Sequence, residues 1–149
     1  MKKIFKKLFC IRMVDNKLNR EQDFFDHLWS SNYNEAEKMI RKREIDPSVK
    51  NNEALQITAI EGNIEFFRFL LKDPRVDPAS QGNRAIKSAS EFGHTELVRM
   101  LLEDKRVDPT VDDNYALRYA QMRNFEDVFT LLHSDERVID NIVDKYYIG

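Results

Sequence analysis

A gap-free repeat of 31 residues constrains the fold of this chain more than any other feature. Residues 45–75 aligned with residues 76–106 give 11 identities in 31 positions. A third copy, residues 107–137, keeps the Val-Asp-Pro start, the Ala-Leu pair of the first half and the Asp-x-Arg end. Self-similarity at a period of roughly 20 to 50 residues indicates a solenoid or another repeat array.

Each copy predicts a first helix of about nine residues. An asparagine precedes each run of periodic apolar residues, and asparagine is a good N-cap because its side chain accepts an otherwise unpaired backbone N–H. These asparagines are Asn52, Asn83 and Asn114. Each run ends at a residue type that readily adopts the left-handed conformation that closes a helix. These closing residues are Gly62, Gly93 and Asn124.

A second helix follows each closing residue and carries paired apolar residues on one face, which we expect to form the core. The pairs are Phe66-Phe67 with Leu70-Leu71, Leu97-Val98 with Leu101-Leu102, and Val128-Phe129 with Leu131-Leu132. An Asp-x-Arg-Val-Asp-Pro motif or a variant of it comes next. Its proline disfavours helix at the preceding residue and is expected to turn the chain outward in an extended loop.

Two helices, a tight turn and an outward loop in a unit of this size resemble the ankyrin repeat. The residues that carry the resemblance are Ala54-Leu55, Gly62-Asn63, Leu70-Leu71, Ala85-Ile86, Ala89, Gly93-His94, Leu101-Leu102, Ala116-Leu117, Ala120 and Leu131-Leu132. The usual Thr-Pro-Leu-His start of the first helix is replaced, and the period is about two residues short. The chain is similar to the Asp-Pro, Asn-x-Ala-Leu variety of ankyrin proteins in giant viruses and amoebae.

The resemblance implies an all-α, helix-turn-helix solenoid over residues 14–149. Its units are predicted at residues 14–44, 45–75, 76–106, 107–137 and 138–149, and the first and last of these are degenerate capping units. Trp29 is expected to pack over the open end of the first unit. At the other end, Tyr146, Tyr147 and Ile148 are expected to pack back on Phe129 and Leu132.

The formal net charge of −2 is unevenly distributed. Residues 1–20 contain seven Lys/Arg and one Asp, a net charge of +6, so the remaining residues carry 17 basic and 25 acidic side chains, or −8. We expect no nucleic-acid ligand for the array, because phosphate binding needs a basic stripe. The single cysteine, Cys10, excludes an internal disulfide and favours a reducing, cytoplasmic location, which is the host cytoplasm if the protein is viral.

Residues 1–13 form a basic amphipathic segment, with five apolar residues among five basic ones at nearly helical spacing. One interpretation is a tail, or a helix laid over the open end of the solenoid. The other is a membrane-surface anchor, in which the positive charges attract anionic lipid and Cys10 is an acylation site. A secretory signal is disfavoured because no uninterrupted apolar run of about seven or more residues follows.

No catalytic, cofactor or metal site is predicted. His27, His94 and His133 lie at different positions of different units, and no Cys/His spacing, Gly-rich phosphate loop or nucleophile elbow is present. His94 lies where the ankyrin family uses a structural histidine. Asp77 and Asp108 each precede a proline, so they are expected to be turn residues rather than an acid and a base.

The resemblance also implies a non-enzymatic module that holds another protein on a concave face, formed by the loop tips and the exposed side of the first helices. Residues at these positions differ between copies, although neutral drift predicts the same variation. The predicted partner-binding residues are Lys50, Glu53, Glu61, Gln81, Arg84, Phe92, Asp112, Tyr115, Met122 and Arg123. Phe92, Tyr115 and Met122 are favoured because aromatic and Met side chains are enriched in interfaces. We expect a monomeric adaptor; the alternative is a peripheral membrane protein anchored by residues 1–13.

Overall fold

The computed structural model describes the backbone of residues 2–145 and the side chains of residues 16–145. Within this part of the chain there are nine helices and no strand, so the predicted all-α class is confirmed. The helices are α1 (Lys2–Trp29), α2 (Tyr33–Arg41), α3 (Val49–Glu61), α4 (Ile64–Leu71), α5 (Ser80–Glu91), α6 (Thr95–Glu103), α7 (Val111–Met122), α8 (Glu126–His133) and α9 (Glu136–Val143).

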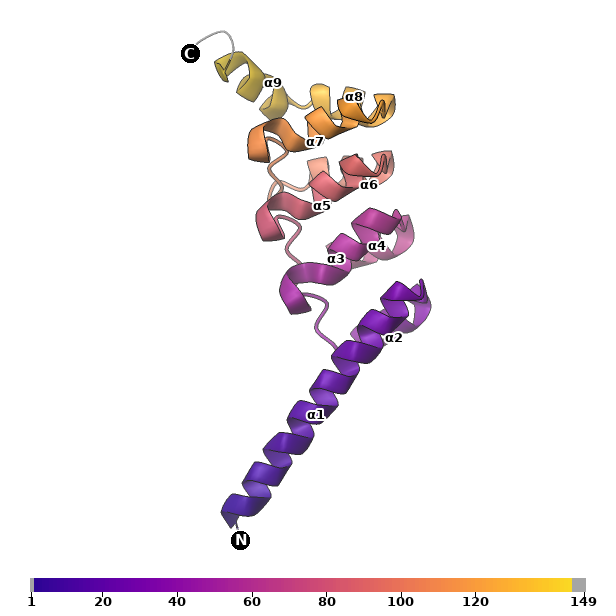
Figure 1. Cartoon of the computed structure of the whole chain (residues 1–149), viewed down its shortest axis with the longest axis vertical. Coiled ribbons are helices and arrows are strands. Elements are labelled where there is room, and N and C mark those ends of the chain that lie inside the picture. The colour runs from indigo at the N-terminus through magenta and orange to yellow at the C-terminus, as the bar shows by residue number, and fades with distance from the viewer. Residues whose placement is uncertain (1, 146–149) are drawn as a thin grey trace.

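The helices pair and the pairs stack in one direction (Figure 1). The first helices form one layer, in which α3 packs on α5 and α5 on α7, and the second helices form another, in which α4 packs on α6 and α6 on α8. The side of the first layer that faces away from the second helices is called the first-helix face below. Figure 1 shows that α1 continues well past the stack at its N-terminal end.

The apolar pairs of the second helices form the core, as predicted. One leucine of each pair is fully buried and recurs at the 31-residue period: these are Leu70, Leu101 and Leu132. The other members, such as Leu71 and Leu102, are half-buried. One continuous hydrophobic cluster extends from Phe24 to Val138. Each unit therefore buries its apolar face against its neighbours and depends on them for stability.

The turn between the two helices contains a left-handed residue in every unit. The four residues are Ser31 (φ 55°), Gly62 (φ 74°), Gly93 (φ 76°) and Asn124 (φ 58°). The predicted closing residues are thus confirmed, and the first unit follows the same period.

Glycine is required at two of these turns because a ring from the next unit lies against the backbone. A Cβ atom on Gly62 would lie 2.4 Å from Cε1 of His94, and one on Gly93 would lie 3.0 Å from the Phe125 ring. His94 is held there because its Nε2 lies 2.8 Å from the carbonyl oxygen of Ile60. The side chain of His94 therefore joins two units.

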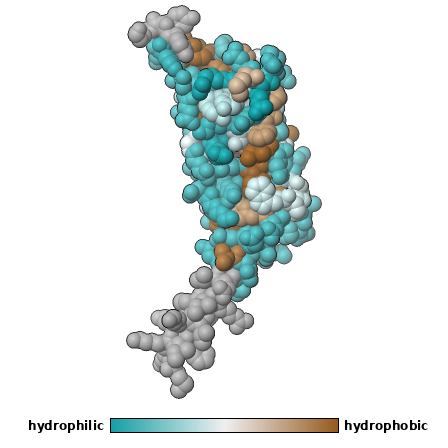
Figure 2. Space-filling model, viewed as in Figure 1, coloured by the Kyte–Doolittle hydropathy of each residue, from teal (hydrophilic) through white to brown (hydrophobic). Residues whose placement is uncertain are grey.

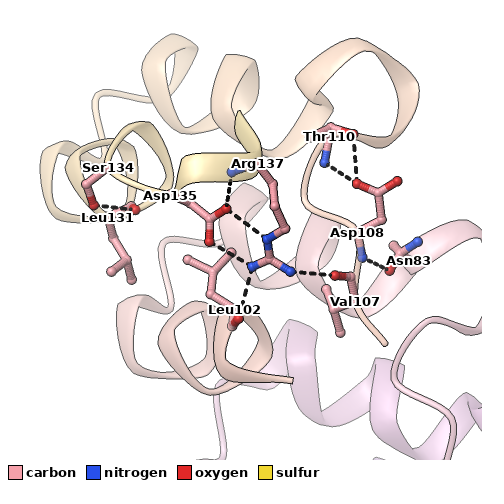
Figure 3. A network of polar contacts seen from close by, with 9 residues as sticks. All are labelled: Asn83, Leu102, Val107, Asp108, Thr110, Leu131, Ser134, Asp135 and Arg137. Atoms are coloured by element: carbon pink, nitrogen blue, oxygen red, sulfur yellow. Dashed lines mark hydrogen bonds and ion pairs between the residues drawn. The ribbon is translucent and has the colours of Figure 1, made fainter. Parts of the chain in front are cut away.

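The prediction that the three asparagines are N-caps was wrong. They are buried, and each ends a turn of three consecutive left-handed residues, at residues 50–52, 81–83 and 112–114. An N-cap needs extended backbone angles, which this turn does not provide. Instead, Asn52 Oδ1 accepts the backbone N–H of Asp77 at 2.9 Å. Asn83 accepts that of Asp108 in the same way at 2.8 Å (Figure 3), so both asparagines tie one unit to the next.

The Asp-x-Arg motif connects the end of a unit to the loop at its start. Arg106 donates from Nε and Nη2 to the two carboxylate oxygens of Asp104, at 3.0 and 2.7 Å. Its Nη1 donates to the carbonyl oxygen of Val76 in the preceding loop at 3.0 Å. Figure 3 shows the same arrangement one unit later, where Arg137 binds Asp135, the carbonyl oxygen of Val107 at the start of its own unit and that of Leu102 in the preceding unit. The bidentate geometry fixes the guanidinium where it can hold the loop backbone.

These ion pairs predict an acid-dependent loss of stability. The hydrogen bonds from Arg106 hold the pKa of Asp104 below its usual range. The stabilisation is therefore complete above the pKa of an unfolded Asp, about 3.9, and is lost as pH falls through the lowered folded pKa. We expect the gap in melting temperature between the parent and Asp104→Asn to narrow between about pH 5 and about pH 3. Glu103→Gln, at an exposed neighbouring acid, is the control. A difference in melting temperature that does not change with pH, or that Glu103→Gln reproduces, would contradict a stabilising role for the Asp104–Arg106 ion pair.

The N-terminal unit departs from expectation in two ways. α1 begins at Lys2 and continues through residue 13 into the first unit without a break. The boundary proposed at residues 13/14 and the other unit limits stay predictions. Trp29 is 63% exposed, so its predicted packing over the open end was wrong. Phe24, Phe25 and Leu28 fill that position instead, and all three are buried.

The C-terminal unit ends the array with α9 in place of another Asp-Pro loop. Val138 is buried like the valines that start the earlier loops. The next N–H, that of Ile139, bonds within the helix to Asp135. The buried Oδ1 of Asn114 consequently has no partner among the described residues. The predicted packing of Tyr146, Tyr147 and Ile148 lies outside the described residues.

Candidate functional site

The predicted residues of the loop tips contact the preceding or following unit. Lys50 places Nζ 4.0 Å from the ring centroid of Phe25. Gln81 donates from Nε2 to the carbonyl oxygen of Asn51 at 3.1 Å. Asp112 forms an ion pair of 2.7 Å with Lys87. All three begin a left-handed turn and are exposed, so they contribute to the stacking of units and also reach the surface.

The predicted residues at the start of the first helices differ in exposure. Glu53 is half-buried, and its Oε2 lies 3.8 Å from Nζ of Lys50. Arg84 is exposed. Tyr115 is half-buried and stacks on Tyr119, with 4.1 Å between ring centroids. A side-chain hydrogen bond with Tyr119, together with burial, raises the pKa of Tyr115 to about 12. Tyr115 is therefore less available to a partner than its sequence position indicates.

The predicted residues at the end of the first helices are the most exposed apolar ones. Phe92 is 49% exposed and Met122 is 63% exposed. Arg123 is also exposed. Glu61 accepts a hydrogen bond from the hydroxyl of Tyr33, and partial burial raises the pKa of its carboxyl.

Two further residues extend this set along the array. Trp29 and Ile60 precede Met122 at multiples of the 31-residue period, and both are exposed, at 63% and 36%. Phe92 lies one residue beyond the corresponding position of its unit. We call Trp29, Ile60, Phe92 and Met122 the apolar row. Figure 2 shows brown and tan patches that follow one another along this side of the array.

Sequence reasoning missed half of this row. Trp29 was interpreted as a cap residue and Ile60 was not chosen as a partner-binding residue. The signal that could have found them is the spacing itself, because Trp29, Ile60 and Met122 occupy one position of the repeat, which Glu91 holds in the unit between Ile60 and Met122. An exposed apolar residue that recurs at one position forms a continuous strip when the units stack.

Acidic side chains lie beside the middle of the row. Glu61 follows Ile60, and Glu91 precedes Phe92. Arg123 follows Met122 at the end of the row. The first-helix face thus combines an apolar strip with acidic groups near its centre, an arrangement that suits a partner with apolar and basic side chains.

Side chains of residues 16–145 form no group of three or more His, Cys, Asp or Glu that could hold a metal ion. A hollow of about 580 Å³ between α1 and α2 is lined by a mixture of charges that includes Arg20, Asp26 and Lys38. Because acidic and basic side chains both line the hollow, it has no electrostatic potential of one sign that would attract a charged ligand. Among the helices described, none is both long enough and apolar enough to span a bilayer.

A family model described as ankyrin repeats, in three copies, matches residues 24–113. The match covers more than half of the chain and includes the degenerate first unit. No curated protein and no solved structure matches the chain significantly.

Proposed function

Because the chain belongs to the ankyrin repeat family, we propose that it is a non-enzymatic adaptor that binds a protein partner on its first-helix face. Ankyrin repeats generally mediate protein–protein interaction. The finer proposal is that the apolar row forms the centre of the contact, with the predicted residues around it as the rim. A cytoplasmic location, favoured by the single cysteine, is part of the same proposal.

The exposure of the apolar row is the observation that carries this proposal. None of the four side chains belongs to the continuous hydrophobic core. Single exposed apolar residues are ordinary, but a contiguous strip of them marks an interaction surface. Aromatic residues and methionine are also the types enriched at the centres of interfaces.

The double change Phe92→Ser and Met122→Ser tests this proposal by capture of partner from an extract of the native host. Truncation of a buried interface aromatic costs about 2 kcal/mol or more of binding, near a thirtyfold loss. We therefore expect the double variant to retain little or none of the protein that the parent retains. Ile139→Ser is the matched control, because Ile139 is 40% exposed on α9 and lies away from the row. Equal capture by the parent and the double variant would place the partner site elsewhere.

A further inference from the structure

We propose that the partner of the apolar row is a second copy of this chain, which contributes the projecting part of its helix α1, so that the chain self-associates rather than remaining the monomer expected from its sequence. This inference rests on the proposed function, because it uses the same surface. It rests on three features: the projecting part of a long helix, a match in spacing between that helix and the exposed apolar row, and complementary charge.

The first feature is the projecting part of α1. Of its described side chains, residues 16–20, 22 and 23 are exposed, and Leu18 is 64% exposed. Packing on the array begins only at Phe24, which is fully buried. A helix gains most of its stability from packing an apolar face rather than from its own backbone. The projecting turns of α1 therefore gain if another surface covers them.

The second feature is a match in spacing. Ile4, Ile11 and Leu18 recur every seven residues in α1, and seven helical residues advance about 10 Å, nearly two turns. Successive first helices in a stack are separated by about 8–10 Å. If such a helix lies along the stack, the spacing of its heptad positions is therefore close to the spacing of the residues in the apolar row. Residues 2–23 extend about 33 Å, and three unit steps along the row cover roughly 24–30 Å.

The third feature is complementary charge. Residues 1–20 carry a net charge of +6, and the rest of the chain carries −8. Glu61 and Glu91 adjoin the middle of the row, so acidic groups lie where a basic helix would bind. Opposite charge steers association and fixes register. The same charge opposes pairing of α1 with another α1, which would bring like charges together.

Sedimentation equilibrium of the full chain over a wide range of concentration tests the proposal. We expect a mass above that of the monomer at high concentration. Leu18→Glu, which alters the helix, and Ile60→Glu, which alters the row, should each weaken self-association by about thirtyfold or more. Met122→Glu is a second row variant in case Ile60→Glu impairs folding, since Met122 is the more exposed residue. Ile139→Glu is the control and should associate like the parent.

Mixing two variants identifies which surfaces meet. Leu18→Glu keeps an intact row, and Met122→Glu keeps an intact helix, so a mixture of the two retains one helix-to-row contact. We expect the mixture to associate more strongly than either variant alone. Undiminished self-association of Met122→Glu would overturn the proposal in favour of helix-to-helix pairing. Undiminished self-association of Leu18→Glu would overturn it in favour of row-to-row pairing.

A parent chain that stays monomeric at every concentration also overturns the inference. Sedimentation with anionic vesicles then shows whether a lipid surface covers α1 instead. This outcome leaves the proposed function intact if Phe92→Ser with Met122→Ser still abolishes capture of a host protein. Loss of both row-dependent capture and self-association would overturn the proposed function as well.

Discussion

Gly62→Ala is expected to lower the free energy of unfolding more than Gly82→Ala does, although both glycines have left-handed backbone angles, with φ of 74° and 63°. An L-residue in this conformation costs about 1–2 kcal/mol, and this cost is common to both variants. At Gly82 the nearest atom to the new methyl is Lys87 Nζ at 3.9 Å, whereas at Gly62 the methyl would overlap the His94 ring. Overpacking of this kind adds about 1–3 kcal/mol.

Equilibrium urea denaturation of both variants measures the difference. The pair Gly62→Ala and His94→Ala supplies the matched control, because removing the ring leaves room for the methyl. We expect the double variant to be more stable than the sum of its two single losses predicts. Equal losses of stability for Gly62→Ala and Gly82→Ala would show that the His94 ring does not restrict position 62 to glycine.

Leu101→Ala is expected to remove roughly 2–5 kcal/mol of stability. Leu101 is fully buried in α6, between the equivalent leucines of the units on either side. Its truncation therefore opens a cavity in the middle of the continuous core, where neighbouring units can least close it. The melting temperature, followed by the helical circular dichroism signal, should fall well below that of the parent.

Leu102→Ala is the control for this prediction, because Leu102 is next in the same helix but only half-buried. We expect a smaller loss. If the two variants melt alike, or Leu101→Ala melts like the parent, then the 31-residue alignment that assigns Leu101 to the core is wrong.

The helices, the closing turns and most of the core could be predicted because they depend on local sequence. The glycine and asparagine at Gly62, Gly93 and Asn124 adopt the left-handed angles that their residue types allow most readily. The leucines of the second helices are buried because a helix with one apolar face packs that face inward. Both signals repeat at the same period, so each copy supports the others.

The left-handed turn at the start of each first helix could not be predicted in this way. Lys50 and Gln81 adopt φ values of 52°, which their side chains disfavour. The turn is held by the hydrogen bond that Asn52 or Asn83 accepts from the backbone N–H 25 residues later. An isolated unit lacks that bond, so local preference favours an N-cap. The compact turn occupies the place of the β-turn that usually precedes the helices of an ankyrin repeat.

The exposed residues were predicted less well than the core. Trp29 resembles a core residue by its type, yet its period places it with Ile60 and Met122 on the surface. Tyr115 resembles a surface residue by its period, yet it stacks on Tyr119. The Tyr115–Tyr119 stack is an i, i+4 pair within α7, which helical periodicity allows. The exposure of Trp29 depends on how α1 packs against the next unit, which helical periodicity alone does not specify.

The proposed function implies that the residues on which folding depends differ from the residues that bind a partner. The most direct test of this separation is the melting temperature of the double variant Phe92→Ser and Met122→Ser. Phe92 is 49% exposed and Met122 is 63% exposed. Surface substitutions usually change stability by less than about 0.5 kcal/mol. We expect a melting temperature close to that of the parent. A fall as large as that of Leu101→Ala would show that the apolar row belongs to the core and would contradict its assignment as a binding surface.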